Sequence, residues 1–454
     1  MKNKKLVKSL MLILLIVIGL TWLIPGTITN QETGALELSL LKPQGLLSVF
    51  GSFDISAQYF FQNSLIVLFV GIFYGVINKT GAYKELIEKI ASKLKKKKEL
   101  FLVLTIIFFI LFTALTNVYF LMFLFVPFFM SILREMGYNK NVLLLSTVGS
   151  VLIGFSSQIM NSMFVKTVAA EGNPYLWVKI GVLLIYMALT VLYALKFSKE
   201  KEKEEEFFEL SKRTGKNINT KPFMLKIVLI VFFIFFLLGF VPWNLPFLST
   251  MHTSIMNLKI GQFAIFGNIF GTFNQFGAWW TSELYTIIIS TIILLAFLYK
   301  LSFDEFIDGV VEGIKKFMVP AFLVGLMTLV TIFAINSGFV GTILKFIVSS
   351  GNAALIALGN MITNPIIADP FYISNYSMTM VLSAINSPNP QQIAYITQVM
   401  YGAVMLLIPT SSIMIAGLAF TEKDYKSWFK YIWKFALVLI ALAFIAIIIT
   451  TLIK

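Results

Sequence analysis

The stretch Leu406-Leu407-Ile408-Pro409-Thr410-Ser411-Ser412-Ile413-Met414 lies inside an almost unbroken apolar run from Val404 to Ala419. A proline within an apolar helix removes a backbone donor, frees a carbonyl and bends the chain. Three hydroxyl side chains follow this proline directly. In hydrocarbon, such an interruption is stable only where it is buried in protein or lines a hydrated cavity. The stretch therefore predicts a broken membrane helix, of the kind that holds solutes near the bilayer midplane in secondary transporters.

The composition of the whole chain indicates an all-α integral membrane protein. Hydrophobic residues make up 58% of the 454 residues and charged residues 13%, whereas a soluble protein has about 25% charged residues. The net charge of +14 does not indicate nucleic-acid binding, because the basic residues lie in loops between apolar runs, as the positive-inside rule requires. The absence of cysteine excludes disulfides and thiolate sites.

The apolar blocks predict about nine transmembrane helices and two re-entrant hairpins. Two blocks, 100–133 and 351–386, are too long for one span and carry a polar interruption near their middle, so we interpret them as the hairpins. Two further blocks, near 142–163 and 391–420, are interpreted as broken helices. The predicted organisation is a first span and external segment (1–40), repeat 1 (41–197), a charged cytoplasmic linker (198–222), connecting spans (223–300) and repeat 2 (301–454).

The two halves of the chain follow the same order of features. Leu68-Phe69-Val70-Gly71-Ile72 leads to an Asn-Lys-Thr-Gly turn, and Phe322-Leu323-Val324-Gly325-Leu326 leads to an Asn-Ser-Gly turn. Each turn precedes a short amphipathic stretch, then an over-long block and a second break. An odd number of spans in each repeat predicts two inverted-topology repeats, with the N-terminus cytoplasmic and the C-terminus outside.

Hydroxyl and amide side chains gather at the four breaks. Helix N-termini at such breaks favour a carboxylate, and unwound carbonyls and hydroxyls suit Na⁺ or an amine. The alternative is that these side chains only join helices in the membrane; their occurrence at all four breaks favours a binding site. The candidates are Thr116, Asn117, Ser156, Ser157, Gln158, Asn161, Thr363, Asn364, Thr410, Ser411 and Ser412.

Asp369 is a further candidate, because a carboxylate at membrane depth is costly unless it is paired or protonated. No arginine lies in an apolar block, which favours an amino acid as substrate, and a cationic one if Asp369 faces the site. No phosphate-binding loop, zinc motif or nucleophile elbow is present, so the sequence does not predict an enzyme or a cofactor. Transport would use a Na⁺ or H⁺ gradient or exchange, with a possible Na⁺ site near Asn117 and Asn364.

The sequence resembles the ion transporter superfamily, in particular its YfcC-like and anaerobic four-carbon dicarboxylate carrier branch. The resemblance rests on the Val-Ile-Asn-Lys-Thr-Gly piece ending at Gly81, on Gly154-Phe155 with Asn161, on Gln398 with Gly402, and on Ile408-Pro409-Thr410-Ser411. It implies a dimeric scaffold, a transport unit that moves against it, and solute-binding roles for Asn161, Gln398, Pro409, Thr410 and Ser411. The chain departs from the pattern at 118–122, which lacks an acidic pair, and at 368–371, which lacks a small-residue tip.

These observations predict a secondary active transporter of an amino acid or small organic anion, working by an elevator-like alternating-access mechanism. Antiport of a basic amino acid is one form of this hypothesis, and a C4-dicarboxylate carrier is the alternative. A passive channel or a non-transporting membrane scaffold is the alternative from another class. The expected partners are a small-molecule substrate, the lipid bilayer and a second copy of the chain, with no nucleic acid.

Overall fold

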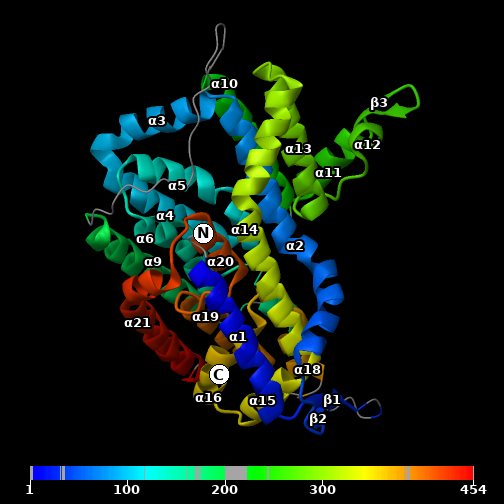
Figure 1. Ribbon diagram of the computed structural model, residues 1–454, viewed down its shortest axis with the longest axis vertical. Coiled ribbons are helices and arrows are strands. Elements are labelled where there is room, and N and C mark those ends of the chain that lie inside the picture. Colours follow the sequence, from blue (N-terminus) through cyan, green and yellow to red (C-terminus); the bar gives the residue numbers. More distant parts are fainter. Residues whose placement is uncertain are drawn as a thin grey trace.

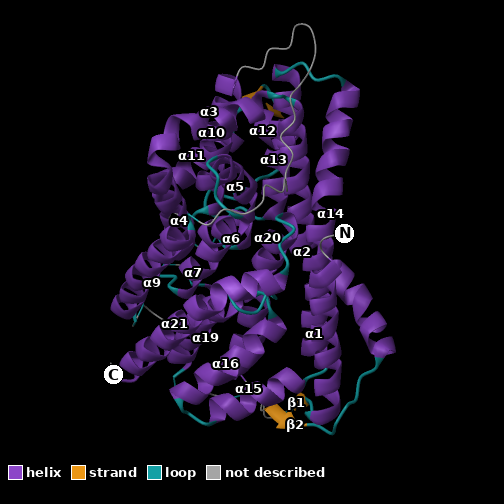
Figure 2. Ribbon diagram, turned by 60° about the vertical axis from the view of Figure 1, so that its left-hand side comes forward, coloured by secondary structure: helices purple, strands orange, loops and turns teal. Residues whose placement is uncertain are grey.

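The computed structural model describes residues 4–30, 32, 36–116, 118–160, 162–168, 173, 175–199, 222–242, 245–383, 385 and 389–452. Helices make up nearly all of its regular structure, as expected for an all-α membrane protein (Figure 1, Figure 2). Two short antiparallel ribbons, at 27–38 and 259–264, were not expected from the sequence. The predicted linker falls mostly on 200–221, outside the described residues.

The elements of the first half are α1 (Lys4–Leu23), β1 (Thr27–Thr29), β2 (Leu36–Leu38), α2 (Leu46–Lys79), α3 (Ala82–Leu94), η1 (Lys95–Lys97), α4 (Lys98–Leu115), η2 (Phe120–Leu124), α5 (Val126–Glu135), α6 (Lys140–Leu144), the π-helical turn η3 (Leu145–Gly149), α7 (Ser150–Ser156), α8 (Met163–Thr167) and α9 (Leu176–Phe197). Between the halves lie α10 (Pro222–Phe240), α11 (Pro246–Met256), β3 (Lys259–Ile260), β4 (Phe263–Ala264), α12 (Ile265–Phe270) and α13 (Thr281–Leu298). The second half contains α14 (Phe303–Asn336), α15 (Phe339–Ser349), α16 (Ala353–Ile367), α17 (Pro370–Tyr372), the π-helical turn η4 (Ile373–Met378), α18 (Thr379–Ser383), α19 (Pro390–Met405), α20 (Ser412–Phe420) and α21 (Tyr425–Leu452).

Among the described residues, eight helices are long and apolar enough to cross a membrane. Seven of them correspond to predicted spans, and the eighth is the α3–α4 stretch Ala82–Leu115. The remaining two predicted spans are the broken helices near 142–163 and 391–420, each of which is divided into shorter pieces. The multi-pass helical membrane protein predicted from composition is therefore confirmed, while the count of nine spans stays a prediction.

Helices α2 and α14 begin earlier than their apolar blocks, at Leu46 rather than near 57 and at Phe303 rather than near 317. Each has 34 residues, which gives a length of about 51 Å at about 1.5 Å per residue. This exceeds the thickness of a hydrocarbon core, which is about 30 Å. Each helix is therefore longer than a hydrocarbon core is thick, and α14 begins with the charged residues Asp304 and Glu305 in its first turn.

The two long helices run antiparallel and cross at four glycines. Gly71 lies against Gly313, and Gly75 lies against Gly309, so residue numbers rise along one helix as they fall along the other. A methyl group added at Gly75 would lie 2.2 Å from the carbonyl oxygen of Gly309. Small residues four positions apart are the pattern that lets membrane helices approach to backbone contact. The crossing is visible near the centre right of Figure 1.

The ends of these helices show the relation between the halves. Both α2 and α14 end in a turn whose glycine has a positive φ, 70° at Gly81 and 78° at Gly338, and both turns lead into an amphipathic helix. Helices α3 and α15 lie at opposite ends of the molecule (Figure 1, Figure 2). The same packing recurs in both halves, with α4 on α7 and α9, and α16 on α19 and α21. This is the arrangement that inverted repeats predict.

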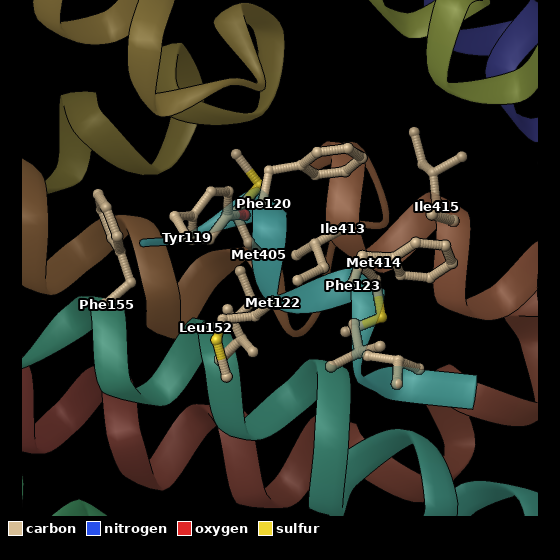
Figure 3. Close-up of a cluster of buried hydrophobic side chains, with 14 of the residues drawn as sticks. Tyr119, Phe120, Met122, Phe123, Leu152, Phe155, Met405, Ile413, Met414 and Ile415 are labelled. Carbon is tan, nitrogen blue, oxygen red and sulfur yellow. The ribbon is translucent and has the colours of Figure 1, made fainter. Parts of the chain in front are cut away.

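Helices α7 and α19 pack on each other where the halves meet, and a buried apolar cluster surrounds the interrupted segments. In Figure 3, Phe120 and Phe123 of η2 point toward Ile413 and Met414 of α20, and Leu152 of α7 lies below them. All of these side chains are buried. Segments that lack regular helical hydrogen bonding are thus enclosed by protein rather than exposed to lipid, which is the condition for irregular backbone at membrane depth.

Candidate functional site

The first break follows α4. Thr116 leaves the helix in an extended conformation, and its hydroxyl donates to the carbonyl of Phe112 (2.6 Å) and accepts from the N–H of Val118 (3.1 Å). The chain then continues through the short helix η2 into α5. The hydroxyl thus adds a second donor to the Phe112 carbonyl, which also accepts from the N–H of Thr116 (3.1 Å), and it gives the N–H of Val118 an acceptor beyond the end of the helix. Asn117, predicted to lie in the site, is outside the described residues.

The second break follows α7 and pairs with the first. The backbone N–H of Ile159 donates to the carbonyl of Ala114 (2.8 Å), and Gln158 Nε2 donates to the carbonyl of Thr116 (2.5 Å). Ser157 donates to the carbonyl of Ile153 within its own helix (3.1 Å). The two breaks of the first half are therefore joined directly, and carbonyls that α4 leaves unpaired find donors here.

Gln398, on α19, connects the second half to this pair. Its Nε2 donates to the carbonyls of Gln158 (3.0 Å) and Ser156 (3.4 Å), and its Oε1 accepts from the hydroxyl of Ser162 (2.6 Å). The residue is fully buried. On the same helix, the carbonyl of Thr397 accepts from Asn364 Nδ2 (3.3 Å). Helix α19 thus carries hydrogen bonds to the second break on one side and to α16 on the other.

The third break lies between α16 and α17. Ala368 adopts a φ of 61°, which is unusual for a residue with a side chain and costs on the order of 1 kcal/mol. The hydroxyls of two residues hold this turn, because Thr331 donates to the carbonyl of Ile367 (2.9 Å) and Tyr401 to that of Ala368 (2.7 Å). The turn places the next residue, Asp369, at the start of α17.

The Asp369 carboxylate joins three segments. Its Oδ1 accepts from the N–H of Phe371 (2.9 Å), and its Oδ2 accepts from Asn63 Nδ2 (2.7 Å) and from the hydroxyl of Ser412 (3.1 Å). Asn63 belongs to the long helix α2, and Ser412 begins α20 after the fourth break. Three hydrogen-bond donors thus stabilise a carboxylate that is only 7% exposed.

The fourth break separates α19 from α20 around Pro409, as the sequence predicts. Ser411 caps α20 by accepting from the N–H of Met414 (3.3 Å), and Thr410 donates to the sulfur of Met405 (3.4 Å). Two carbonyls left free at the end of α19 accept from aromatic side chains of α21: that of Leu407 from Tyr425, and that of Leu406 from Trp428. The break is therefore held by side chains on both of its flanks.

A pair of tyrosines joins the first break to the third. The hydroxyls of Tyr119 and Tyr401 lie 3.1 Å apart, and Tyr401 donates to the carbonyl of Ala368. With the contacts above, all four breaks belong to one connected set of hydrogen bonds.

A cavity of about 330 Å³ opens beside this set. It is lined by Asn63 of α2, Tyr119 of the first break, Asp369 and Phe371 of the third, and the segment 277–281 before α13. Its volume is at the small end of the range of about 300–1,000 Å³ for ligand pockets. Among its described lining residues, Asp369 is the one charged side chain.

The sequence-predicted candidates divide into three groups. Gln158, Gln398, Asn364, Asp369 and Ser412 bond between segments, and Asp369 also lines the cavity. A second group bonds locally at its own break or within its own helix: Thr116, Ser157, Thr363, Thr410 and Ser411. The hydroxyl of Ser156 has no hydrogen-bond partner within the described residues. Asn161, like Asn117, lies outside them.

Sequence reasoning missed Asn63, Tyr119, Tyr401 and Ser162. Asn63 and Tyr401 lie in the middle of regular helices, so no interruption of the apolar pattern marks them. Tyr119 and Ser162 lie next to predicted breaks and could have been included by proximity alone. Glu283, a second acidic residue that is largely buried, caps the start of α13 by accepting from the N–H of Trp280 (2.9 Å) and from Asn274.

The fold and the connected breaks define a class, a multi-pass membrane protein with interrupted helices at its centre. A profile of the family described as DcuC, C4-dicarboxylate anaerobic carrier, matches residues 63–452, which is most of the chain. The chain therefore belongs to this family of membrane transporters, as its resemblance to that branch predicted.

Other comparisons add little. A search of curated proteins found no match. The crystal structure of the YdaH transporter from Alcanivorax borkumensis aligns over 97% of each chain, with a TM-score of 0.41 and 13% sequence identity. At that level of similarity, no property of this chain is inferred from it.

Proposed function

We propose that the protein is a secondary active carrier of a four-carbon dicarboxylate. The observation that carries this proposal is the family match over residues 63–452. The sequence analysis favoured an amino acid because the spans lack arginine; membership of this family supports instead the alternative that was kept beside it. The four connected breaks support a binding site at the place where the two halves meet.

The charge of the cavity bears on how a dianion would bind. The interrupted helices offer N-termini and hydroxyls to a carboxylate, at Ser411 before α20 and at the turn before α17. Asp369, however, places a negative charge in the cavity and next to Ser412 at the start of α20. Two unit charges 4 Å apart repel by about 4 kcal/mol at an effective dielectric constant of about 20. Binding of a dianion here therefore requires a cation, and we propose coupling to Na⁺ or H⁺.

Three buried oxygens near Gln398 could ligate such a cation. Ser156 Oγ, Gln158 Oε1 and Thr397 Oγ1 have no hydrogen-bond partner within the described part of the chain. Buried polar atoms are nearly always paired, so unpaired ones call for a ligand or a water molecule. Oxygen atoms alone suit a hard cation such as Na⁺. Thr397 contacts Asn364, which with Asn117 marks the predicted Na⁺ site, and we propose these three oxygens as candidate ligands of that cation.

The proposed movement follows from the arrangement of the elements. The antiparallel pair α2 and α14 forms a long frame. The predicted hairpins, 100–133 and 351–386, together with α7 and α19 would form the unit that carries the breaks. Asp369 links the two through Asn63. We propose that this unit shifts against the frame in an elevator-like cycle. A dimer of such frames, implied by the resemblance, remains part of the proposal.

The test is uptake of labelled succinate by proteoliposomes that contain the purified protein. We expect accumulation that depends on an inward Na⁺ or H⁺ gradient, or on preloaded dicarboxylate if the carrier works by exchange. The Thr410→Ala/Ser411→Ala variant should fold and lose most of this uptake. Protein-free liposomes are the control. The absence of dicarboxylate uptake under every gradient and preload would reject the proposal.

Amino-acid transport is the second candidate, and one observation favours it: the Asp369 carboxylate in the cavity could pair with an amino group. The same proteoliposomes decide the matter with labelled arginine and with preloaded ornithine. Arginine accumulation without succinate uptake would select this candidate. Ion currents that persist without any substrate would instead select a passive channel.

A further inference from the structure

A second and larger cavity shares no lining residue with the cavity beside Asp369. It measures about 550 Å³, is open on one side, and is lined by residues of α2, α3, α4 and α10 and by the segment 124–129 around the start of α5. Its walls are mostly aromatic: they include Phe73, Phe108, Phe125, Phe128, Phe232 and Phe233. The lining of this cavity has no place in the transport site proposed above.

One end of the cavity carries positive charge. Lys89 and Lys93 lie one turn apart on α3, and Lys226 lies one turn from the start of α10, the helix that packs against α3. All three are exposed, and within the described residues none forms an ion pair. No lining residue is acidic. An apolar cavity bordered by three lysines is complementary to a ligand that has an anionic head group and an apolar tail.

We propose that this cavity binds an anionic phospholipid, with an acyl chain among the phenylalanines and the phosphate at the three lysines. The chain crosses a bilayer, so phospholipid surrounds it at high concentration. Basic pockets between membrane helices are known sites for anionic head groups. Exposed Phe223 and Ile230 on α10 form an apolar edge along which a lipid tail can enter from the bilayer. A free phosphate would leave the aromatic chamber unfilled, and a zwitterionic lipid would leave the lysines unpaired.

The experiment compares two lipids with identical acyl chains, dioleoyl phosphatidylglycerol and dioleoyl phosphatidylcholine, added to the purified full-length protein in detergent. Bound lipid is counted by native mass spectrometry, and the melting temperature is followed in parallel. We expect the anionic lipid to bind more tightly and to raise the melting temperature more. Each Lys→Ala substitution should weaken that binding about fivefold, from about 1 kcal/mol per basic residue near a lipid surface. The triple variant should weaken it on the order of 100-fold.

A matched control removes the same charge elsewhere. Lys426, Lys430 and Lys434 are exposed and spaced four apart on α21, away from the cavity, and their triple alanine variant should bind the lipid as the wild type does. Leu229→Trp fills the cavity and should prevent binding while all three lysines remain.

Three results would overturn the proposal. If the α21 triple alanine variant lost as much lipid binding as the cavity variant, the lysines would attract anionic lipid non-specifically. Equal binding of the two lipids would show that the cavity does not distinguish an anionic from a zwitterionic head group. Full displacement of the lipid by glycerol 3-phosphate would show that the apolar chamber is not used. None of these readouts depends on transport.

Discussion

At the scale of the residue, Asp369 both joins three segments and supplies the negative charge of the cavity. Its carboxylate holds together α17, α20 and the long helix α2 through three donors. Removing the Asp369 carboxylate takes away the acceptor of Asn63 Nδ2 and of the Ser412 hydroxyl. Each donor left unpaired in a buried site lowers the free energy of unfolding by about 1–3 kcal/mol. Asp369 therefore has two separable roles, one in joining segments and one in setting the charge of the cavity.

The substitution Asp369→Asn tests the role in charge, because it keeps the size of the side chain. We expect the protein to fold and succinate uptake to become less dependent on the coupling cation, since one negative charge has left the cavity. Ser412→Ala removes the hydroxyl that donates to Asp369 (3.1 Å) and accepts weakly from Asn63 (3.4 Å), and it should slow uptake by about fivefold, from about 1 kcal/mol. Asp54→Asn neutralises an exposed carboxylate of α2 and should change nothing. Unaltered cation dependence in Asp369→Asn would contradict the proposed charge role.

At the scale of the element, the crossing of α2 and α14 sets the distance between the halves. Four glycines bring the backbones into contact, and Lys79 pairs with Glu312 at one side of the crossing (2.6 Å). An added methyl group cannot be absorbed by a flexible side chain here, because the atom it meets is a backbone carbonyl oxygen. Asn63 lies on α2, so a shift of this helix also moves one wall of the cavity.

Gly75→Ala should therefore destabilise the protein by about 1–3 kcal/mol, the usual cost of overpacking. Thermal unfolding in detergent measures this as a lower melting temperature than that of the wild type. Gly181→Ala is the matched control, because Gly181 lies in the helix α9 and no atom lies within 4 Å of its added methyl group. That control should be neutral or slightly stabilising. Equal melting temperatures for both variants would show that the crossing is looser than the contacts indicate.

At the scale of the whole molecule, the proposed cycle requires the frame and the unit of the breaks to separate. Asn63 on the frame and Ser412 on α20 lie in direct contact, with Asn63 Nδ2 3.4 Å from Ser412 Oγ. Lys79 and Glu312 are also in contact, but both belong to the frame. A covalent link at the first pair would oppose the movement, and one at the second would not.

Because the chain has no cysteine, this difference can be tested without background. We expect the Asn63→Cys/Ser412→Cys variant, joined by a short bifunctional thiol reagent, to lose succinate uptake and to recover it when a cleavable reagent is reduced. The Lys79→Cys/Glu312→Cys variant, treated in the same way, should keep its uptake. Continued transport by a fully cross-linked first variant would exclude movement of α20 relative to α2.

The sequence by itself determined the class of protein and the places where its helices break. Hydropathy, proline and polar interruptions act over a few residues, so the ends of α4, α7 and α19 fall at the predicted breaks. Helix α16 instead continues through the interruption predicted at Thr363 and Asn364, with Pro365 inside it, and ends at Ile367. Short motifs in the sequence likewise predicted membership of the dicarboxylate carrier family, which the family match confirms.

Only the tertiary structure decided what the breaks meet. Asn63 and Asp369 are 306 positions apart, and Tyr119 and Tyr401 are 282 apart, so no local pattern marks either pair. Their approach depends on the glycine crossing of α2 and α14 and on the packing of α7 against α19. These pairs meet because whole helix surfaces pack together. That packing depends on many residues along each helix, and not only on the two residues that form the hydrogen bond.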